Sequence, residues 1–218
     1  MIGIVIILII FCLIVYLFEP YPLKLHSSDT QIIYNNTQSQ SECLMIVAHP
    51  DDEFIFGGDV IIKDPDWRWC VVVLTGATRS SRYISSKFID RGKELKQSSD
   101  ALKFKCIHLD FGDSSHNRNW DKSRLKSQLS QIINERDWKM IVTHNKDGEY
   151  GHLQHKLTHK IVKQVTQHIT VPLLTFHYDK QYNCTQQKLK LMNTLYKSQK
   201  GIMNTHIDWI KHSTIKQL

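Results

Sequence analysis

The sequence predicts an α/β fold in which helices cover both faces of a mostly parallel sheet. From residue 43 onwards, short apolar runs dense in β-branched residues alternate with stretches of helical periodicity. Runs that are apolar throughout indicate strands buried on both faces, and such strands need helices on each side of the sheet. These two observations favour a Rossmann-like arrangement, and the 218 residues suffice for one domain with a sizeable core.

The apolar runs define the expected strands, at residues 43–48, 69–75, 106–110, 140–144 and 173–178. Apolar periodicity predicts helices at residues 58–63, 86–103, 121–135, 152–168 and 186–200, with further helix in the tail. The helix at 121–135 shows this pattern most plainly, because Leu125, Leu129 and Ile132 fall on one face.

The N-terminus differs from the rest of the chain. Residues 1–18 carry no charged side chain and are followed by Glu19-Pro20. No positive residue precedes this run and no small-residue cleavage site ends it, so an uncleaved membrane helix fits better than a secretory signal. The polar residues 19–42 then form a tether, and residues 43–218 form the folded domain.

A positive residue, Lys24, follows the apolar run. The positive-inside rule therefore favours a cytosolic body. We predict a single-pass membrane protein that contacts the membrane through residues 1–18, with the endoplasmic reticulum as the candidate compartment.

The charge balance is basic, with a formal net charge of +7. The lysines are scattered, which indicates a solubilising surface, and attraction to an anionic membrane or a phosphorylated substrate is the alternative. No nucleic-acid-binding motif accompanies the charge, so we expect no nucleic acid partner. The five cysteines show no paired spacing, and we expect free thiols.

Chemistry-bearing residues follow the predicted strands. They are His49 after the first strand, Thr75 at the end of the second, Asp110 at the end of the third and His144 at the end of the fourth. Ligands in open α/β sheets gather at the carboxyl ends of the strands, so we expect these residues to emerge at one edge.

Two clusters near this edge suit a metal ion. One is A-H-P-D-D-E at residues 48–53, and the other is G-E-Y-G-H-L-Q-H at 148–155, where His152 and His155 share one helical face. Each cluster alone is typical of a solvated turn or of structural histidines. Together they place two imidazoles opposite two carboxylates. Two histidines and one aspartate form a suitable catalytic zinc set, which leaves the second aspartate free to take a proton from the metal-bound water.

The paired motifs resemble those of the PIG-L/LmbE family of zinc-dependent N-deacetylases, which act on N-acetylglucosamine-containing substrates. The resemblance extends from about residue 43 to residue 204. It includes R-G-K-E-L at residues 91–95, similar to the family's RxxEL helix, and Ser198-Gln199, similar to a serine–glutamine pair near the C-terminus.

The resemblance implies how the first motif and the ligand histidine work. His49, Asp52 and His155 would bind Zn2+, and Asp51 would be the general base. Glu53 is interpreted as an acid at the start of a helix or as a support that hydrogen-bonds behind the ligands.

The resemblance also implies three further roles. His152 would protonate the developing oxyanion or donate a hydrogen bond to it. Tyr150 would assist there, and Arg91 would hold a substrate hydroxyl or phosphate.

Some positions depart from the family pattern. The eukaryotic enzymes that act in GPI-anchor biosynthesis usually read G-V-S-G-H-x-N-H where this chain reads G-E-Y-G-H-L-Q-H, which is closer to bacterial sugar deacetylases. Asn145 and Gln154 stand where an aspartate is frequent, and Tyr196 stands where many members have histidine. These departures leave the substrate open.

Three functions therefore compete. The first is deacetylation of a GlcNAc-containing glycoconjugate, with lipid-linked N-acetylglucosaminylphosphatidylinositol as one candidate. The second is deacetylation of a soluble or nucleotide-linked sugar, and the third is a non-catalytic glycan- or lipid-binding protein on the same fold. A nucleotide-binding protein is disfavoured because no GxGxxG turn follows the first strand.

Overall fold

The computed structural model describes residues 31–34, 42–64, 66–76, 91–113 and 120–218. The expected membrane helix at residues 1–18 lies outside the described residues, as do most of the expected tether and the start of the helix expected at 86–103.

One sheet organises the described part of the chain. Its strands are β1 (Gln31–Tyr34), β2 (Cys43–Val47), β3 (Trp69–Thr75), β4 (Lys105–Phe111), β5 (Met140–Thr143), β6 (Leu173–Tyr178) and β7 (Ser213–Gln217). Their order across the sheet is β1-β4-β3-β2-β5-β6-β7. The inner strands pair in parallel, whereas β1 and β7 pair antiparallel at the two edges. The predicted mostly parallel sheet is thus confirmed.

The strand order reverses beside the central strand. After β2 the chain builds β3 and β4 on one side, and then returns to build β5 and β6 on the other. The loops that follow β2 and β5 therefore leave neighbouring strands in opposite directions. A crevice at this kind of reversal, outside the carboxyl ends of the strands, is where ligands bind in open α/β sheets.

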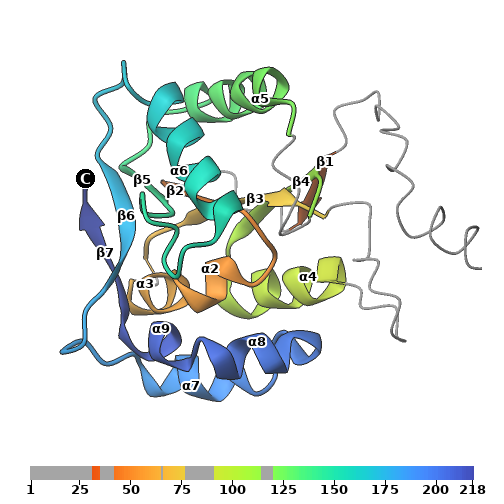
Figure 1. Ribbon diagram of the computed structural model, residues 1–218, viewed down its shortest axis with the longest axis vertical. Coiled ribbons are helices and arrows are strands. Elements are labelled where there is room, and N and C mark those ends of the chain that lie inside the picture. The colour runs from red at the N-terminus through yellow and green to blue at the C-terminus, as the bar shows by residue number, and fades with distance from the viewer. Residues whose placement is uncertain (1–30, 35–41, 65, 77–90, 114–119) are drawn as a thin grey trace, which may run out of the picture.

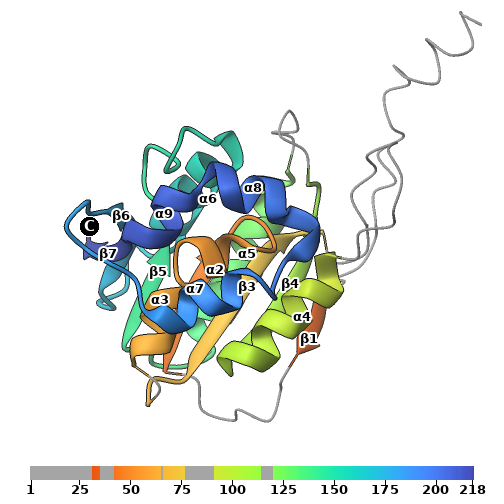
Figure 2. The same cartoon turned by 90° about the horizontal axis from the view of Figure 1, so that it is seen from below.

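Helices cover both faces of the sheet, as predicted. They are α2 (Asp52–Ile55), α3 (Gly58–Lys63), α4 (Arg91–Leu102), α5 (Lys122–Asn134), α6 (Leu153–Val165), α7 (Gln186–Met192), α8 (Lys200–Thr205) and α9 (Ile207–His212). Figure 1 shows α5 and α6 above the sheet and α2, α3 and α4 below it. Seen from below in Figure 2, α7, α8 and α9 lie across the outer side of this lower layer.

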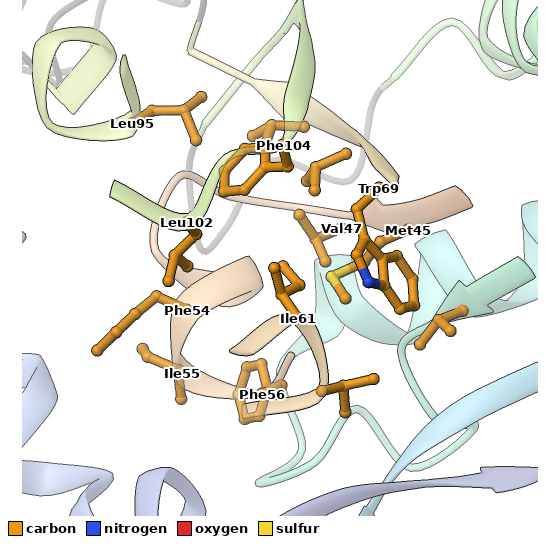
Figure 3. Packing of buried hydrophobic residues seen from close by; sticks show 14 of the residues in the cluster. Met45, Val47, Phe54, Ile55, Phe56, Ile61, Trp69, Leu95, Leu102 and Phe104 are labelled. Atoms are coloured by element: carbon orange, nitrogen blue, oxygen red, sulfur yellow. The ribbon is translucent and has the colours of Figure 1, made fainter. Parts of the chain in front are cut away.

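The central strand β2 feeds two hydrophobic cores because its side chains alternate between the faces. Met45 and Val47 pack into the lower core, with Phe54, Phe56 and Trp69 among its other buried members (Figure 3). The neighbouring residues Leu44 and Ile46 of β2 face the upper core, which is completed by the apolar faces of α5 and α6. Burial on both faces explains why β2 reads as an uninterrupted apolar run.

The expected elements agree closely with the described ones inside the sheet and differ at its margins. The strand expected at 173–178 and the helix expected at 58–63 have the predicted bounds. Inside the segment predicted to be a tether, β1 pairs with β4. In the tail, where part of the chain was expected to be helical, the strand β7 follows α9 and was not predicted. Both additional strands are short edge strands, whose sequence signal is weak.

The predicted single-pass membrane localisation is contradicted. Among the described residues, no helix has the length and apolar character needed to cross a membrane. The longest described helices, α5 and α6, have 13 residues each, whereas a membrane-spanning helix needs about 20.

Candidate metal centre and active site

The two predicted motifs meet at the reversal of the strand order. The first motif follows β2 directly, and the second lies in the loop after β5 and the first turn of α6. Hydrogen bonds tie the end of β2 to its neighbours: Thr75 Oγ1 donates to Ala48 O at 2.9 Å, and Ala48 N donates to His144 Nε2 at 3.0 Å. The expectation that these strand ends converge at one edge is met for His49, Thr75 and His144.

A chain of hydrogen bonds sets the tautomer of His49. The amide Nε2 of Gln154 donates to the carbonyl of Gly112 at 2.9 Å, which turns Oε1 of Gln154 towards His49. That oxygen lies 2.6 Å from His49 Nε2. Because Oε1 is only an acceptor, His49 carries its proton on Nε2. In the neutral ring, Nδ1 is then left with a free lone pair.

A carboxylate sets the tautomer of His155 in the same way. Oε2 of Glu149 lies 2.7 Å from His155 Nδ1, so Nδ1 donates and Nε2 keeps its lone pair. Burial alone would raise the pKa of Glu149, but the imidazoles of His144 and His155 lower it to about 2, which keeps this carboxylate ionised.

Three acceptor atoms consequently face one another. His49 Nδ1 lies 3.2 Å from His155 Nε2 and 3.2 Å from Asp52 Oδ2, and His155 Nε2 lies 3.3 Å from that oxygen. Ligand atoms about 2.0–2.1 Å from a tetrahedral zinc ion are separated by about 3.3 Å. Burial raises the pKa of Asp52, yet the surrounding imidazoles hold it well below its usual range, so its oxygen is negative. The donor set and its spacing fit Zn2+.

His144 is close to the same oxygen but has a different task. Its Nε2 lies 3.3 Å from Asp52 Oδ2, and with Asp52 and His155 it forms a second group of possible ligands. However, its Nε2 lone pair already accepts the Ala48 N–H, and its Nδ1 lies 2.9 Å from Glu149 Oε2. His144 is therefore a support for the ligands, and the set His49, Asp52 and His155 remains the better one.

His152 stands at the mouth of this centre as the residue before α6. Its ring centroid lies 4.7 Å from that of His49 and 4.4 Å from that of His155. Among the described residues, its Nδ1 atom has no hydrogen-bond partner. Burial and the neighbouring imidazoles lower the pKa of His152 to about 3, so the ring is neutral and one nitrogen can donate a hydrogen bond.

Asp51 adopts a left-handed backbone conformation, with φ at 109°, directly before α2. Such a conformation costs about 1–3 kcal/mol for a residue other than glycine and is found disproportionately at functional sites. Burial raises the pKa of Asp51 to about 7, although the Arg91 guanidinium opposes this shift.

Arg91, the first residue of the RxxEL motif, is committed to protein groups. Its Nη2 lies 3.2 Å from Asp51 Oδ2 and also donates to the carbonyl of Pro50. Its Nη1 lies 2.7 Å from Asp113 Oδ2. With its side chain 13% exposed, Arg91 lies beside the predicted base at the edge of the site.

Glu94, the other charged residue of the RxxEL pattern, joins α4 to the serine–glutamine pair. Glu94 accepts a hydrogen bond from the backbone N–H of Ser198 at 2.8 Å and a second from its hydroxyl. The side-chain amide of Gln199 donates to the Ser198 hydroxyl at 3.1 Å. The serine–glutamine pair thus fastens the C-terminal helices to α4.

Glu53 supports the motif from behind, as predicted. Its carboxylate accepts the Asp51 N–H at 3.0 Å, the Ser98 hydroxyl at 2.7 Å and the hydroxyl of Tyr196. Tyr196, the departure from the family's histidine, is therefore part of the scaffold beneath Asp51.

Tyr150 lies at the rim and is 44% exposed. Its ring stacks on His206 at a centroid distance of 4.0 Å and lies 5.9 Å from the ring of His152. The structure therefore places all seven predicted site residues around one centre, with Tyr150 and Arg91 furthest out.

The sequence did not predict the supporting roles of four residues: Asp113, Glu149, Gln154 and His144. Asp113 takes the place facing the centre that was expected for Asp110, because β4 runs through Asp110 to Phe111. Glu149 offered one signal, namely a carboxylate flanked by histidines in a glycine-containing loop.

Comparison with known proteins identifies the family and the fold of the chain. The family model described as "PIG-L: GlcNAc-PI de-N-acetylase" matches residues 44–166, just over half of the chain. Protein L374 of Acanthamoeba polyphaga mimivirus is 32% identical over 194 residues, which covers 86% of this chain and 84% of that protein. N-acetylglucosaminyl-phosphatidylinositol de-N-acetylase of Bos taurus is 31% identical over 121 residues, covering 53% of this chain and 46% of the bovine enzyme.

Among solved structures, N,N'-diacetylchitobiose deacetylase from Pyrococcus horikoshii superposes with a TM-score of 0.60 at 14% identity. The match covers 84% of this chain and 86% of that one. At this identity the likeness shows a shared fold. The matched family model, which covers more than half of the chain, shows that the chain belongs to the PIG-L family.

Proposed function

We propose that this protein is a zinc-dependent N-deacetylase that hydrolyses the acetamide of an N-acetylglucosamine-containing glycoconjugate and releases acetate. The observation that carries the proposal is the convergence of His49 Nδ1, Asp52 Oδ2 and His155 Nε2 within 3.2–3.3 Å of one another. Three buried acceptors at this spacing are stabilised by a cation, and a carboxylate that is not needed as a ligand, Asp51, lies next to them.

Zn2+ held by these three residues would supply a Lewis acid that acidifies a water molecule and polarises the acetyl carbonyl. Asp51 takes a proton from the attacking water as the water oxygen bonds to the acetyl carbon. His152 donates a hydrogen bond to the carbonyl oxygen as that oxygen becomes negative. The carbon–nitrogen bond then breaks, and the departing amine takes up the proton that Asp51 removed, so the products are acetate and a free amino sugar.

The environment of each residue supports its role. A pKa near 7 suits a general base that works at neutral pH, and burial raises the pKa of Asp51 to about this value. His152 is neutral, which favours hydrogen-bond donation to the oxyanion over full protonation of it. Tyr150, at the exposed rim, is positioned to contact the sugar.

Arg91 has a narrower role than the resemblance implies. Its guanidinium already contacts Asp51 Oδ2 at 3.2 Å and Asp113 Oδ2 at 2.7 Å. We infer that Arg91 mainly orients Asp51 and favours its ionised form. Any contact with a substrate hydroxyl or phosphate uses the part of the guanidinium that these carboxylates leave free.

Two substrate classes are candidates. Lipid-linked N-acetylglucosaminylphosphatidylinositol is favoured by the similarity to the bovine enzyme. A soluble or nucleotide-linked N-acetyl sugar is favoured by Tyr150 and Gln154, which depart from the usual eukaryotic motif. A non-catalytic binding protein is disfavoured, because binding alone gives no reason to bury Asp51 in a strained backbone conformation beside the ligands.

An acetate-release screen tests the function and chooses the substrate. The full chain, supplied with zinc, is incubated with N-acetylglucosaminylphosphatidylinositol, N-acetylglucosamine, N,N'-diacetylchitobiose and a UDP-linked N-acetyl sugar. We expect acetate from at least one of these substrates, and none after zinc is removed with a chelator. Absence of acetate from all four, with zinc bound, would contradict the proposed reaction.

A further inference from the structure

The loop after β5 directs the side chain of Glu149 towards the protein interior. Glu149 has a left-handed backbone conformation, with φ at 59°. Its N–H donates to Asn145 Oδ1 at 3.1 Å, and the same oxygen accepts the Asp147 N–H at 2.9 Å. The Asn145 amide nitrogen donates to Phe176 O on β6 at 3.2 Å. This loop is therefore fixed to the sheet with the Glu149 side chain fully buried.

The buried carboxylate is completely satisfied by three donors. Its Oε1 accepts the Asn145 N–H at 2.8 Å. Its Oε2 lies 2.9 Å from His144 Nδ1 and 2.7 Å from His155 Nδ1. Because burying a carboxylate is costly unless it is paired, the arrangement is stable only while both rings present an N–H to Oε2.

The two rings also hold each other. His144 and His155 stack with their centroids 3.9 Å apart and their planes 15° from parallel. His144 Nε2 accepts the backbone N–H of Ala48, the residue before the ligand His49. One carboxylate thereby connects the end of β2, the end of β5 and the first turn of α6, which are the three elements that carry or flank the ligands.

We propose that Glu149 is a positioning residue of the metal centre. With its support His144, it holds His155 in the Nδ1–H tautomer and in one ring orientation, so that Nε2 is presented to the metal ion. This inference rests on the proposed metal-dependent function. Carboxylate partners of ligand histidines generally strengthen metal binding about 10–100-fold. The loop conformation thus strengthens metal binding, because it places Glu149 against His155.

The test compares zinc affinity in charge-matched variants of the full chain. Glu149→Gln keeps the size of the side chain and removes its charge. Asp147→Asn removes the same charge from the same loop, but the side chain of Asp147 is exposed and, among the described residues, contacts only Lys146, and its substitution leaves the backbone N–H that Asn145 accepts in place. Zinc dissociation constants are measured by competition with a chelator, and circular dichroism checks that each variant is folded.

We expect Glu149→Gln to weaken zinc binding by at least tenfold and Asp147→Asn to leave it within twofold of the wild type. An equal affinity in Glu149→Gln and the wild type would overturn the inference. A wild type that binds no zinc would instead contradict the proposed function, which keeps the two failures distinct.

A second measurement does not depend on any variant folding. In the metal-free wild type, imidazole nitrogen NMR reports which nitrogen of His155 carries the proton. We expect the proton on Nδ1, in contact with Glu149. A proton on Nε2 would overturn the positioning role even if the Glu149 variant proved too unstable to purify.

Discussion

The Nδ1 atom of His49 lies 3.2 Å from the Nε2 atom of His155. Gln154 and Glu149 hold the protons of these rings on their far nitrogens, so two lone pairs meet across this distance. Asp52 adds a negative oxygen to the same point. Such a concentration of acceptors is unfavourable without a cation, and it accounts for the cluster of neighbouring acids and distant histidines in the sequence.

Replacing the proposed base should separate chemistry from metal binding. Asp51→Asn is expected to lower the rate of acetate release by about 10²–10⁴-fold, the usual contribution of a general base. Zinc content should be unchanged, because Asp51 is not one of the ligands. Asp147→Asn serves as the control for loss of one charge. Full activity in Asp51→Asn would remove Asp51 from the mechanism.

The pH profile tests the role of Arg91. The Arg91 guanidinium lowers the pKa of Asp51 against the effect of burial, so its removal should raise that pKa. A base must be deprotonated to act, and activity therefore declines as the pH falls through its pKa. In Arg91→Met, the acid limb of kcat/KM should move to higher pH.

The control for this profile is Lys96→Met, which removes a positive charge from the exposed side of the same helix. Its profile should match the wild type. A higher KM in Arg91→Met with an unmoved acid limb would show instead that Arg91 serves the substrate.

Replacing Gly148 tests how closely the loop after β5 must approach the start of α6. Its φ is +68°, and a Cβ atom there would lie 2.5 Å from His152 O. Gly148→Ala should therefore displace the start of α6, lower acetate release by at least tenfold and reduce stability by at least about 1–2 kcal/mol, the cost of a left-handed non-glycine residue.

Gly201→Ala is the matched control for this change. Gly201 lies in α8, and among the described residues no atom outside its chain neighbours and its own helix backbone lies within 4 Å of a Cβ built on it. This substitution should leave activity unchanged and stabilise the helix by about 0.5–1 kcal/mol. Equal activity in the two variants would argue against a close approach at Gly148.

A buried lysine predicts a specific dependence of stability on pH. Lys188 is fully buried and donates to the carbonyl of Ile55 on α2 at 2.9 Å. Burial lowers its pKa to about 8, although Asp59 opposes this shift. In the unfolded chain a lysine titrates near 10.4, so between about pH 8 and 10.4 the unfolded state binds more protons. The contribution of Lys188 to the free energy of unfolding should rise with pH across this window.

Urea unfolding at pH 7.5 and pH 10 measures this effect. Between these values, the wild type should gain about 2 kcal/mol relative to Lys188→Met, as the two pKa values imply. Lys190→Met removes an exposed lysine of the same helix and should show no such difference. Parallel changes in the wild type and Lys188→Met would show that Lys188 titrates normally.

The sequence predicts best those strands that are apolar along their whole length. The run at 69–75 is apolar on both faces because β3 lies inside the sheet, so its type and its bounds could both be predicted. The tail strand β7 contains Ser-Thr-Ile-Lys-Gln and contacts the sheet on one edge only, which leaves no such pattern. Soon after His49, Asp52 begins a one-turn helix that is too short to show periodicity, so the sequence does not predict it.

The ligands were predictable and their supports were not. His49, Asp52 and His155 follow strand ends whose convergence is a topological rule. Glu149 reaches the centre only because its backbone is left-handed and Asn145 holds the loop, and neither feature can be read from composition. Gln154 departs from the family pattern, but its hydrogen bond to His49 depends on the carbonyl of Gly112, 42 residues away.

The central claim is that His49, Asp52 and His155 bind one zinc ion. Calorimetric titration of zinc into the metal-free full chain, and into the ligand variant His155→Ala, tests it most directly. We predict one high-affinity site per chain in the wild type, as expected for about one ion held by three ligands. The variant should lose this site while staying folded. A folded wild type that binds no zinc, or a His155→Ala variant that binds it equally well, would contradict the account.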